Sequence, residues 1–174
     1  MKLILISVFF LVLVSFSTPL TLTGLASSKE LTVMFWPDST FTHYIAEDVV
    51  LSPNSESIAS MVVTIDSSAT SSDQLGFENE ESYPDLSFSF SYTDGYEVSG
   101  TATAEVYQDI LNKISYSRSD KDTFTVTSPI ETYSRTLTFT ITTTGGSQIT
   151  STKPLAISRA KKGYIENSRK VITV

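Results

Sequence analysis

The chain has 174 residues, of which 40% are hydrophobic and 18% are charged, and its formal net charge is −7. This length and composition are typical of one globular domain. The absence of cysteine excludes a disulfide framework, thiol nucleophiles and thiolate metal sites. The acidic balance argues against nucleic acid as a partner, because phosphates require a basic surface.

The N-terminal 26 residues have the pattern of a secretory signal peptide. Lys2 precedes an apolar run, Leu3 to Phe16, whose 14 residues fall short of the ~20 that a membrane-spanning helix needs. Gly24-Leu25-Ala26 fits the small-x-small cleavage pattern, so cleavage after Ala26 is predicted, and cleavage after Ser17 is an earlier alternative. An uncleaved anchor is the third reading. Removal of the leader would give a secreted protein without a membrane span.

Charge is distributed unevenly along the rest of the chain. Between Glu30 and Asn112 there are 15 acidic residues and no Lys or Arg, whereas residues 159–170 contain five basic residues against Glu166 alone. Solubility at neutral pH accounts for the acidic stretch, and calcium binding is the alternative. The predicted division of the chain is a signal peptide at 1–26, a β domain at 27–158 and a basic C-terminal tail at 159–174.

The first half of the predicted domain reads as short strands separated by turns. In the segment 58–66, Met61, Val63 and Ile65 share one face, the alternation typical of a half-buried strand. The acidic segment 73–85 reads as an irregular loop. The predicted extended segments of this half are 31–36, 41–44, 46–53 and 58–66.

Two hairpins are predicted further along the chain. Ser alternates with apolar residues over 86–92, and Asp94-Gly95 then favours a two-residue type I′ turn into a second strand. Thr alternates with apolar residues over 135–142, and Gly145-Gly146 turns this strand into 148–158. The residues of this second hairpin predicted to face inward are Leu137, Phe139 and Ile141.

A short helix is predicted between the hairpins, at about residues 103–113. The hydroxyl of Thr101 or Thr103 is expected to cap it. Tyr107 and Leu111 form an apolar i,i+4 pair, and the period changes from 3.6 to 2 after the helix. Such a short helix must dock on a core, so we expect a crossover from the edge of one sheet to a strand of another; a partner-binding helix is the alternative. Val106, Ile110, Ile114 and Tyr116 are also predicted to face the core, and Gln108, Asp109 and Asn112 to face water.

The segments "SGTATAEVYQDILNKISYS" and "SPIETYSRTLTFTITTTGGSQITST" together resemble the cadherin-like repeat of large bacterial surface adhesins. The Tyr-x-x-x-Leu unit is also similar, more weakly, to the membrane-proximal region of the calsyntenins. The stronger resemblance covers Gly100 to Thr152, and a weaker one runs back to about Val49. The matching residues are Gly100, Thr101, Ala102, Thr103, Tyr107, Leu111, Tyr116, Arg135, Thr136, Leu137, Phe139 and Ile141.

The resemblance implies an all-β fold, an Ig-like or cadherin-like β-sandwich with the short crossover helix, and an extracellular adhesive or spacer role. The closing hairpin of the repeat often has an Asp-Gly turn, whereas this chain has Thr143-Thr144-Gly145-Gly146. No cofactor or metal site is therefore expected. Weak calcium binding by Asp120-Lys121-Asp122 is the alternative, because Ca²⁺ takes several oxygen ligands.

Residues that could support catalysis are few. His43 is the only histidine, no G-x-S-x-G nucleophile motif is present, and a partly buried structural histidine is the expected reading. The densest acids are Glu78, Glu80, Glu81 and Asp85, which are expected to lie in a flexible loop. A carboxylate pair leaves no local spacing, so a small secreted hydrolase stays as the alternative to a non-enzymatic module.

Aromatic residues offer one further reading. Trp36, Tyr83 and Tyr92 could form a carbohydrate platform, although such residues more often pack in a core or on a sheet. We therefore expect a secreted or cell-surface module that is not an enzyme. Its expected partner is an extracellular protein, a glycan or a second copy of the chain, and a purely structural spacer is the further alternative.

Overall fold

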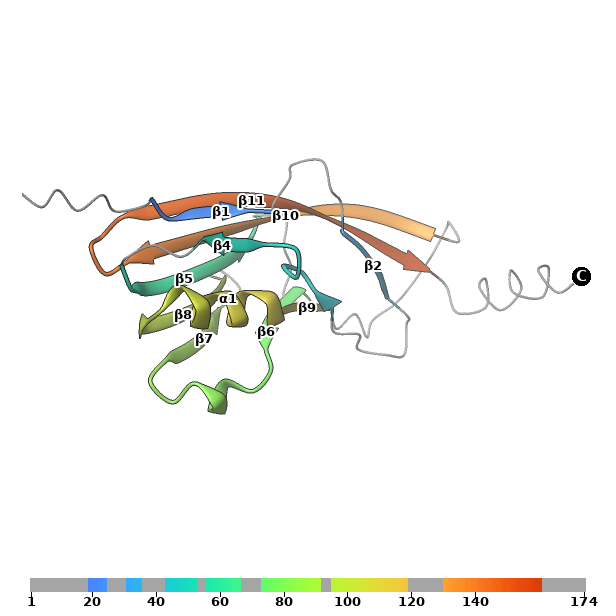
Figure 1. Ribbon diagram of the computed structural model, residues 1–174. Coiled ribbons are helices and arrows are strands. Elements are labelled where there is room, and N and C mark those ends of the chain that lie inside the picture. The colour runs from blue at the N-terminus through green and yellow to red at the C-terminus, as the bar shows by residue number, and fades with distance from the viewer. Residues whose placement is uncertain are drawn as a thin grey trace, which may run out of the picture.

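The computed structural model describes residues 19–24, 31–35, 43–52, 56–66, 73–91, 95–118 and 130–160 (Figure 1). At 31–35, 118, 130–133 and 159–160 it describes the backbone alone. The elements in chain order are β1 (Thr21–Thr23), β2 (Leu31–Phe35), β3 (His43–Tyr44), β4 (Val50–Ser52), β5 (Ile58–Ile65), β6 (Asp73–Phe77), the 3-10 helix η1 (Glu80–Ser82), β7 (Ser87–Ser91), β8 (Gly95–Ala102), α1 (Ala104–Lys113), β9 (Ile114–Arg118), β10 (Ile130–Thr143) and β11 (Gln148–Ala160). Over these residues the fold is thus mostly β with one α-helix, as the sequence predicts.

The largest sheet has six strands in the order β2-β11-β10-β5-β8-β7. Its pairs are antiparallel except that β2 runs parallel to β11. The β10–β11 hairpin is the longest unit and confirms the second predicted hairpin. Its turn is closed by a 2.9 Å hydrogen bond from the Thr143 amide to the Ser147 carbonyl, and Gly146 has a φ of 84°, which glycine adopts readily.

The β7–β8 hairpin confirms the first predicted pair of strands, but the predicted two-residue turn is wrong. Ser91 pairs with Gly95, so residues 92–94 connect the strands. Gly95 has a φ of 88°, and a Cβ there would lie 2.2 Å from the Val63 carbonyl oxygen. The Asp-Gly pattern therefore predicted the hairpin correctly, whereas Gly95 is itself the first residue of β8 and allows the close approach of this strand to β5.

A second sheet has three strands in the order β3-β9-β6. The prediction of an irregular loop at 73–85 is wrong for its first five residues, which form β6. In β6 the side chains of Asp73, Leu75 and Phe77 are buried. The alternation was missed because its first inward position is a carboxylate, which is rarely fully buried without a partner.

Helix α1 joins β8 of the large sheet to β9 of the small sheet. The crossover therefore leaves from the strand next to the edge, because β7 lies outside β8. Thr103 is the N-cap residue, but the predicted cap is wrong in its chemistry, because no hydrogen bond joins the Thr103 side chain to the helix backbone. Within the described part of the chain, no helix has the length and apolar character needed to cross a bilayer.

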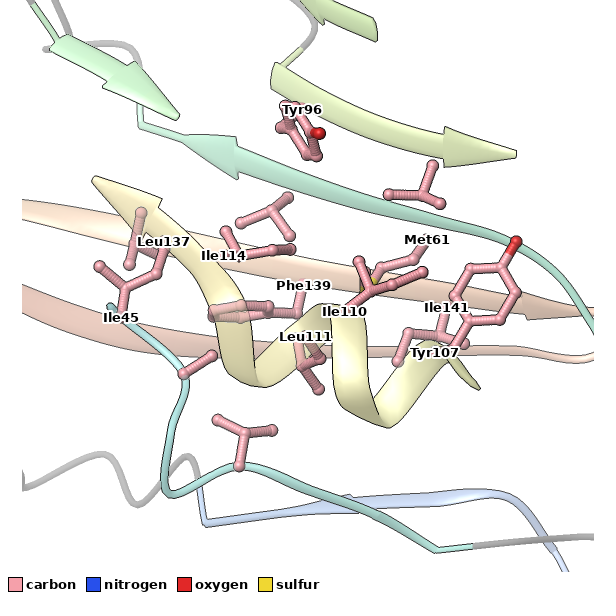
Figure 2. Packing of buried hydrophobic residues seen from close by; sticks show 14 of the residues in the cluster. Ile45, Met61, Tyr96, Tyr107, Ile110, Leu111, Ile114, Leu137, Phe139 and Ile141 are labelled. Carbon is pink, nitrogen blue, oxygen red and sulfur yellow. The ribbon is translucent and has the colours of Figure 1, made fainter. Parts of the chain in front are cut away.

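The core lies between the large sheet and the layer formed by α1 and the small sheet (Figure 2). Most of the residues that were predicted to face the core are fully buried, which confirms those predictions. Val106 and Ile65 are only half-buried, because they lie at the rim of the core. The predicted inward residues with no exposed surface are Met61, Val63, Tyr107, Ile110, Leu111, Ile114, Tyr116, Leu137, Phe139 and Ile141. Burial of this many large side chains is the main contribution to the stability of the fold.

Two strands extend beyond the predicted limits of the domain. Thr21–Thr23, inside the predicted signal peptide, form β1 and pair with β4. At the other end, β11 continues to Ala160, two residues into the predicted tail. The cleavage positions at Ser17 and Ala26, the remaining tail residues 161–174 and the Asp120–Asp122 loop lie outside the described residues.

Candidate functional site

A shallow hollow of about 250 Å³ lies where α1 crosses β4, and we call it the α1–β4 hollow. Its lining is Leu51, Ala104, Glu105, Gln108, Asp109 and Asn112. Leu51 comes from β4, and the other five residues lie on one side of α1 because they are spaced three or four positions apart. The hollow therefore combines an apolar floor with a polar helix face.

The prediction that Gln108 faces water is wrong, because its side chain forms hydrogen bonds with the backbone at β4. Its Oε1 accepts a hydrogen bond from the Leu51 amide, and its Nε2 donates to the Val49 carbonyl oxygen at 2.8 Å. Nε2 also lies within hydrogen-bond distance of the Asn112 side-chain amide. The carboxamide thus satisfies one backbone donor of β4 and one backbone acceptor directly before it, as a neighbouring strand would.

Two carboxylates line the helix side of the hollow, and both are held in the ionised form. A hydrogen bond from Thr103 lowers the pKa of Glu105 below its usual value. Hydrogen bonds from Lys113 and Tyr83 lower the pKa of Asp109. The Lys113 ammonium lies 2.8 Å from the Asp109 carboxylate, and this contact raises the pKa of Lys113.

The chemistry that this hollow offers is hydrogen-bond acceptance. Glu105 and Asp109 carry negative charge at neutral pH and stand in solvent, and Asn112 adds an amide beside them. Such a surface suits hydroxyl or ammonium groups of a partner, which are donors. The apolar contribution of Leu51 and Ala104 would add a small area of hydrophobic contact.

A second polar cluster is buried between the two sheets, and it consists of Asp73, Tyr116 and Arg135. The Tyr116 hydroxyl donates to Oδ1 of Asp73, and the Arg135 guanidinium donates to Oδ2 at 3.3 Å. Asp73 is 2% exposed and Arg135 8%. Each oxygen of the buried carboxylate is therefore bonded, as burial of a charge requires.

This Asp73 cluster joins three strands of two sheets. Asp73 and Tyr116 belong to β6 and β9, whereas Arg135 belongs to β10. His43 lies on β3 opposite Tyr116 and is half-buried, which agrees with the expected partly buried histidine. The periodicity of the sequence predicted that Tyr116 faces the core, Arg135 was singled out only through the resemblance, and no local signal marked Asp73 as their partner.

A second charge pair, between buried Lys153 and half-buried Asp48, ties β11 to the turn before β4. The Lys153 ammonium donates to Oδ1 of Asp48, and the Lys153 side chain is 5% exposed. A lysine inside a Thr-rich strand gives no indication that its side chain faces the protein.

The acids expected to form a flexible loop lie on the surface around η1. Glu78, Glu80, Glu81 and Asp85 are all exposed. Oε1 of Glu80 accepts a 2.8 Å hydrogen bond from the Tyr96 hydroxyl, and burial followed by this contact raises the pKa of Tyr96. Glu80 therefore fastens the loop to β8 and is tied into the fold.

Of the three residues considered for an aromatic platform, the structure describes Tyr83 alone. Tyr83 packs in a cluster with Phe77 and Phe88, at ring-centroid distances of 5.7 and 6.3 Å. Its hydroxyl donates to Asp109, and burial followed by this contact raises its pKa. Trp36 and Tyr92 lie outside the described residues. Tyr83 thus acts mainly as a packing residue between the η1 loop and α1.

Within the described ranges, no three His, Asp or Glu side chains gather in an arrangement that could hold a metal ion. Comparison with known proteins gives no match: no family model fits the chain, and no curated protein or solved structure is significantly similar to it. The function of the candidate site must therefore be inferred from its geometry and from the resemblance of the sequence to the cadherin-like repeat.

Proposed function

We propose that this chain is a secreted Ig-like or cadherin-like β-sandwich module that acts by contact with an extracellular protein, a glycan or a second copy. Catalysis is not part of the proposed role. The observation that carries the proposal is the packing of the residues behind the resemblance. Tyr107, Leu111, Tyr116, Leu137 and Phe139 all lie fully buried in one core.

The Gly-Thr-Ala-Thr segment before the helix has a physical role that fits this reading. The Tyr107 hydroxyl donates to the Gly100 carbonyl oxygen at 2.7 Å, which fastens the first turn of α1 to the end of β8. Gly100 has a φ of 132°, and a Cβ there would lie 2.7 Å from a methyl group of Leu86. Glycine and tyrosine at this spacing therefore form one structural unit, in the order found in the cadherin-like repeat.

The α1–β4 hollow is the contact surface that we propose for a partner. Its two ionised carboxylates favour a partner with hydroxyl or ammonium donors, such as a glycan or a lysine-rich protein segment. The shallow shape fits surface contact, because pockets that bind small molecules generally enclose most of the ligand.

Binding of the secreted protein to a glycan array and to lysine-rich peptides tests the proposal. The double variant Glu105→Gln and Asp109→Asn removes both charges from the hollow. The control, Glu47→Gln with Glu81→Gln, removes two charges from exposed positions elsewhere. We expect the first variant to weaken binding at least tenfold and the control to bind like the wild type.

Three results would count against the proposal. Equal binding by both double variants would show that the hollow does not bind the partner. Binding in neither the array nor the peptide assay would favour the structural spacer. Hydrolysis of any glycan during the incubation would overturn the non-enzymatic role and favour a carboxylate-pair hydrolase.

A further inference from the structure

Strand β1 lies inside the segment that the sequence assigns to a removable signal peptide. Thr21, Leu22 and Thr23 pair with Ser52, Leu51 and Val50 of β4 in antiparallel register. Figure 1 shows β1, in blue, running beside β11 at the upper edge of the fold, and β1 contacts this strand as well. Residues 21–23 therefore close the seam between β4 and the large sheet.

The side chains around β1 are fitted to this position. Leu20 is 8% exposed and belongs to the hydrophobic core, and Leu22 packs against it. Gly24 has a φ of 82°, and a Cβ there would lie 1.8 Å from the Asp48 carbonyl oxygen. Any residue with a side chain would clash with that backbone, so Gly24 allows the chain to reach β4.

Asp48 also fixes the opposite side of the same seam. Its carboxylate accepts a hydrogen bond from the buried ammonium of Lys153 on β11. The turn that receives Gly24 is thus held in place by a charge pair. Segment 20–24 is an integral part of the seam, with core contacts, strand pairing and a glycine that its neighbour requires.

Cleavage after Ala26 would separate this strand from the domain. The remaining chain would lack Leu20 and Leu22, and the edge of β4 that pairs with β1 would lose its backbone partners. Lost apolar burial and unmade backbone hydrogen bonds both destabilise a small domain. The cut that preserves the seam must lie before Leu20.

We infer that signal peptidase cleaves this chain between Ser17 and Thr18, so that β1 belongs to the mature domain. Ser15 and Ser17 supply the small residues at the third and first positions before the cut, as such peptidases require. Water hydrolyses the Ser17–Thr18 peptide bond, which leaves a carboxylate on Ser17 and a new amino terminus on Thr18. The mature protein then begins three residues before β1.

The inference relies on the secretion that is part of the proposed function, and one measurement separates the two. The full chain is expressed in a host with a secretory pathway, and the intact mass of the secreted protein is determined. A mass that starts at Thr18 is the expected result. A mass that starts at Ser27 would overturn the inference and leave secretion standing, and a cell-associated chain that retains Met1 would overturn both.

The role of β1 is tested independently with two purified chains, 18–174 and 27–174. We expect the shorter chain to melt at a temperature lower by ~10 °C, because the core contacts of Leu20 and Leu22 and the β1–β4 pairing are missing. Within the longer chain, Leu20→Ala should lower the melting temperature and Thr21→Ala, at an exposed position, should not. Equal melting temperatures for the two chains would show that β1 is dispensable and would overturn the inference.

Discussion

The Asp73 cluster allows a quantitative prediction about the contact between the two sheets. Asp73→Asn removes the negative charge and keeps the shape of the side chain, and Arg135→Met removes the positive charge and keeps most of the length. The two charged groups lie 3.3 Å apart, and their side chains are 0% and 9% exposed. Because solvent is nearly excluded, their interaction should be much stronger than that of a surface pair.

The magnitude follows from the separation. At an effective dielectric constant of ~20, two unit charges 3.3 Å apart attract by about 5 kcal/mol. Desolvation of both groups offsets much of this attraction in the intact pair, but loss of one partner leaves the other charge buried alone. We expect each single substitution to lower the free energy of unfolding by about 3–5 kcal/mol. The double variant should lose about 2–3 kcal/mol less than the sum of the single losses.

Urea unfolding followed by circular dichroism measures all four proteins of this cycle. The exposed pair Asp109 and Lys113 provides the matched control, with Asp109→Asn, Lys113→Met and their combination. Its coupling should be far smaller, because the two side chains are 49% and 45% exposed and solvent screens the charges. Additive losses for Asp73 and Arg135 would refute the reasoning, since they would show that the two buried charges do not stabilise one another.

The remaining predictions concern the helix and its contacts. Leu111→Ala should lower the free energy of unfolding by about 2–5 kcal/mol, because Leu111 has no exposed surface. Val106→Ala, at a half-buried position, should lower it by clearly less. A wild-type melting temperature for Leu111→Ala would contradict the docked helix. Gln108→Leu leaves the Val49 carbonyl and the Leu51 amide without their side-chain partner. Urea unfolding should therefore show a free energy of unfolding that is lower by about 1–3 kcal/mol. An unchanged free energy of unfolding would mean that water replaces the carboxamide. Burial raises the pKa of Tyr107 from its ordinary value near 10 to about 12. The contribution of this shift to stability is complete below pH ~10 and is lost as pH rises toward ~12, because only the unfolded chain releases the phenol proton in that range. Urea unfolding across this range should show that the free energy of unfolding declines less steeply for Tyr107→Phe than for the wild type. The same decline in both proteins would exclude Tyr107 as its source.

The local pattern of the sequence was sufficient for much of the architecture. Alternation at Leu137, Phe139 and Ile141 predicted which face of β10 is buried, and the i,i+4 spacing of Tyr107 and Leu111 predicted the buried face of α1. Both predictions succeeded because a side chain's direction is set by the period of its own element. Burial then follows from hydrophobicity without knowledge of the partner strand.

The site residues depend on contacts that no local pattern encodes. Arg135 lies 62 positions from Asp73, and Gln108 lies 59 positions from Val49. In isolation, Asp73 reads as part of an acidic loop and Gln108 as part of a solvated helix face. Only the approach of β6 to β10, and of α1 to β4, changes these polar groups into buried or strand-holding ones.

The limits of the domain show the same division between sequence and structure. The sequence by itself determined the β-rich composition, the two hairpins, the single helix and the presence of a leader-like apolar run. The tertiary structure alone decided that Leu20, Leu22 and Gly24 belong to the folded seam beside β4. The physical reason is that a short apolar segment has the same local pattern in a leader and in a strand, and only the surface available to bury it separates the two.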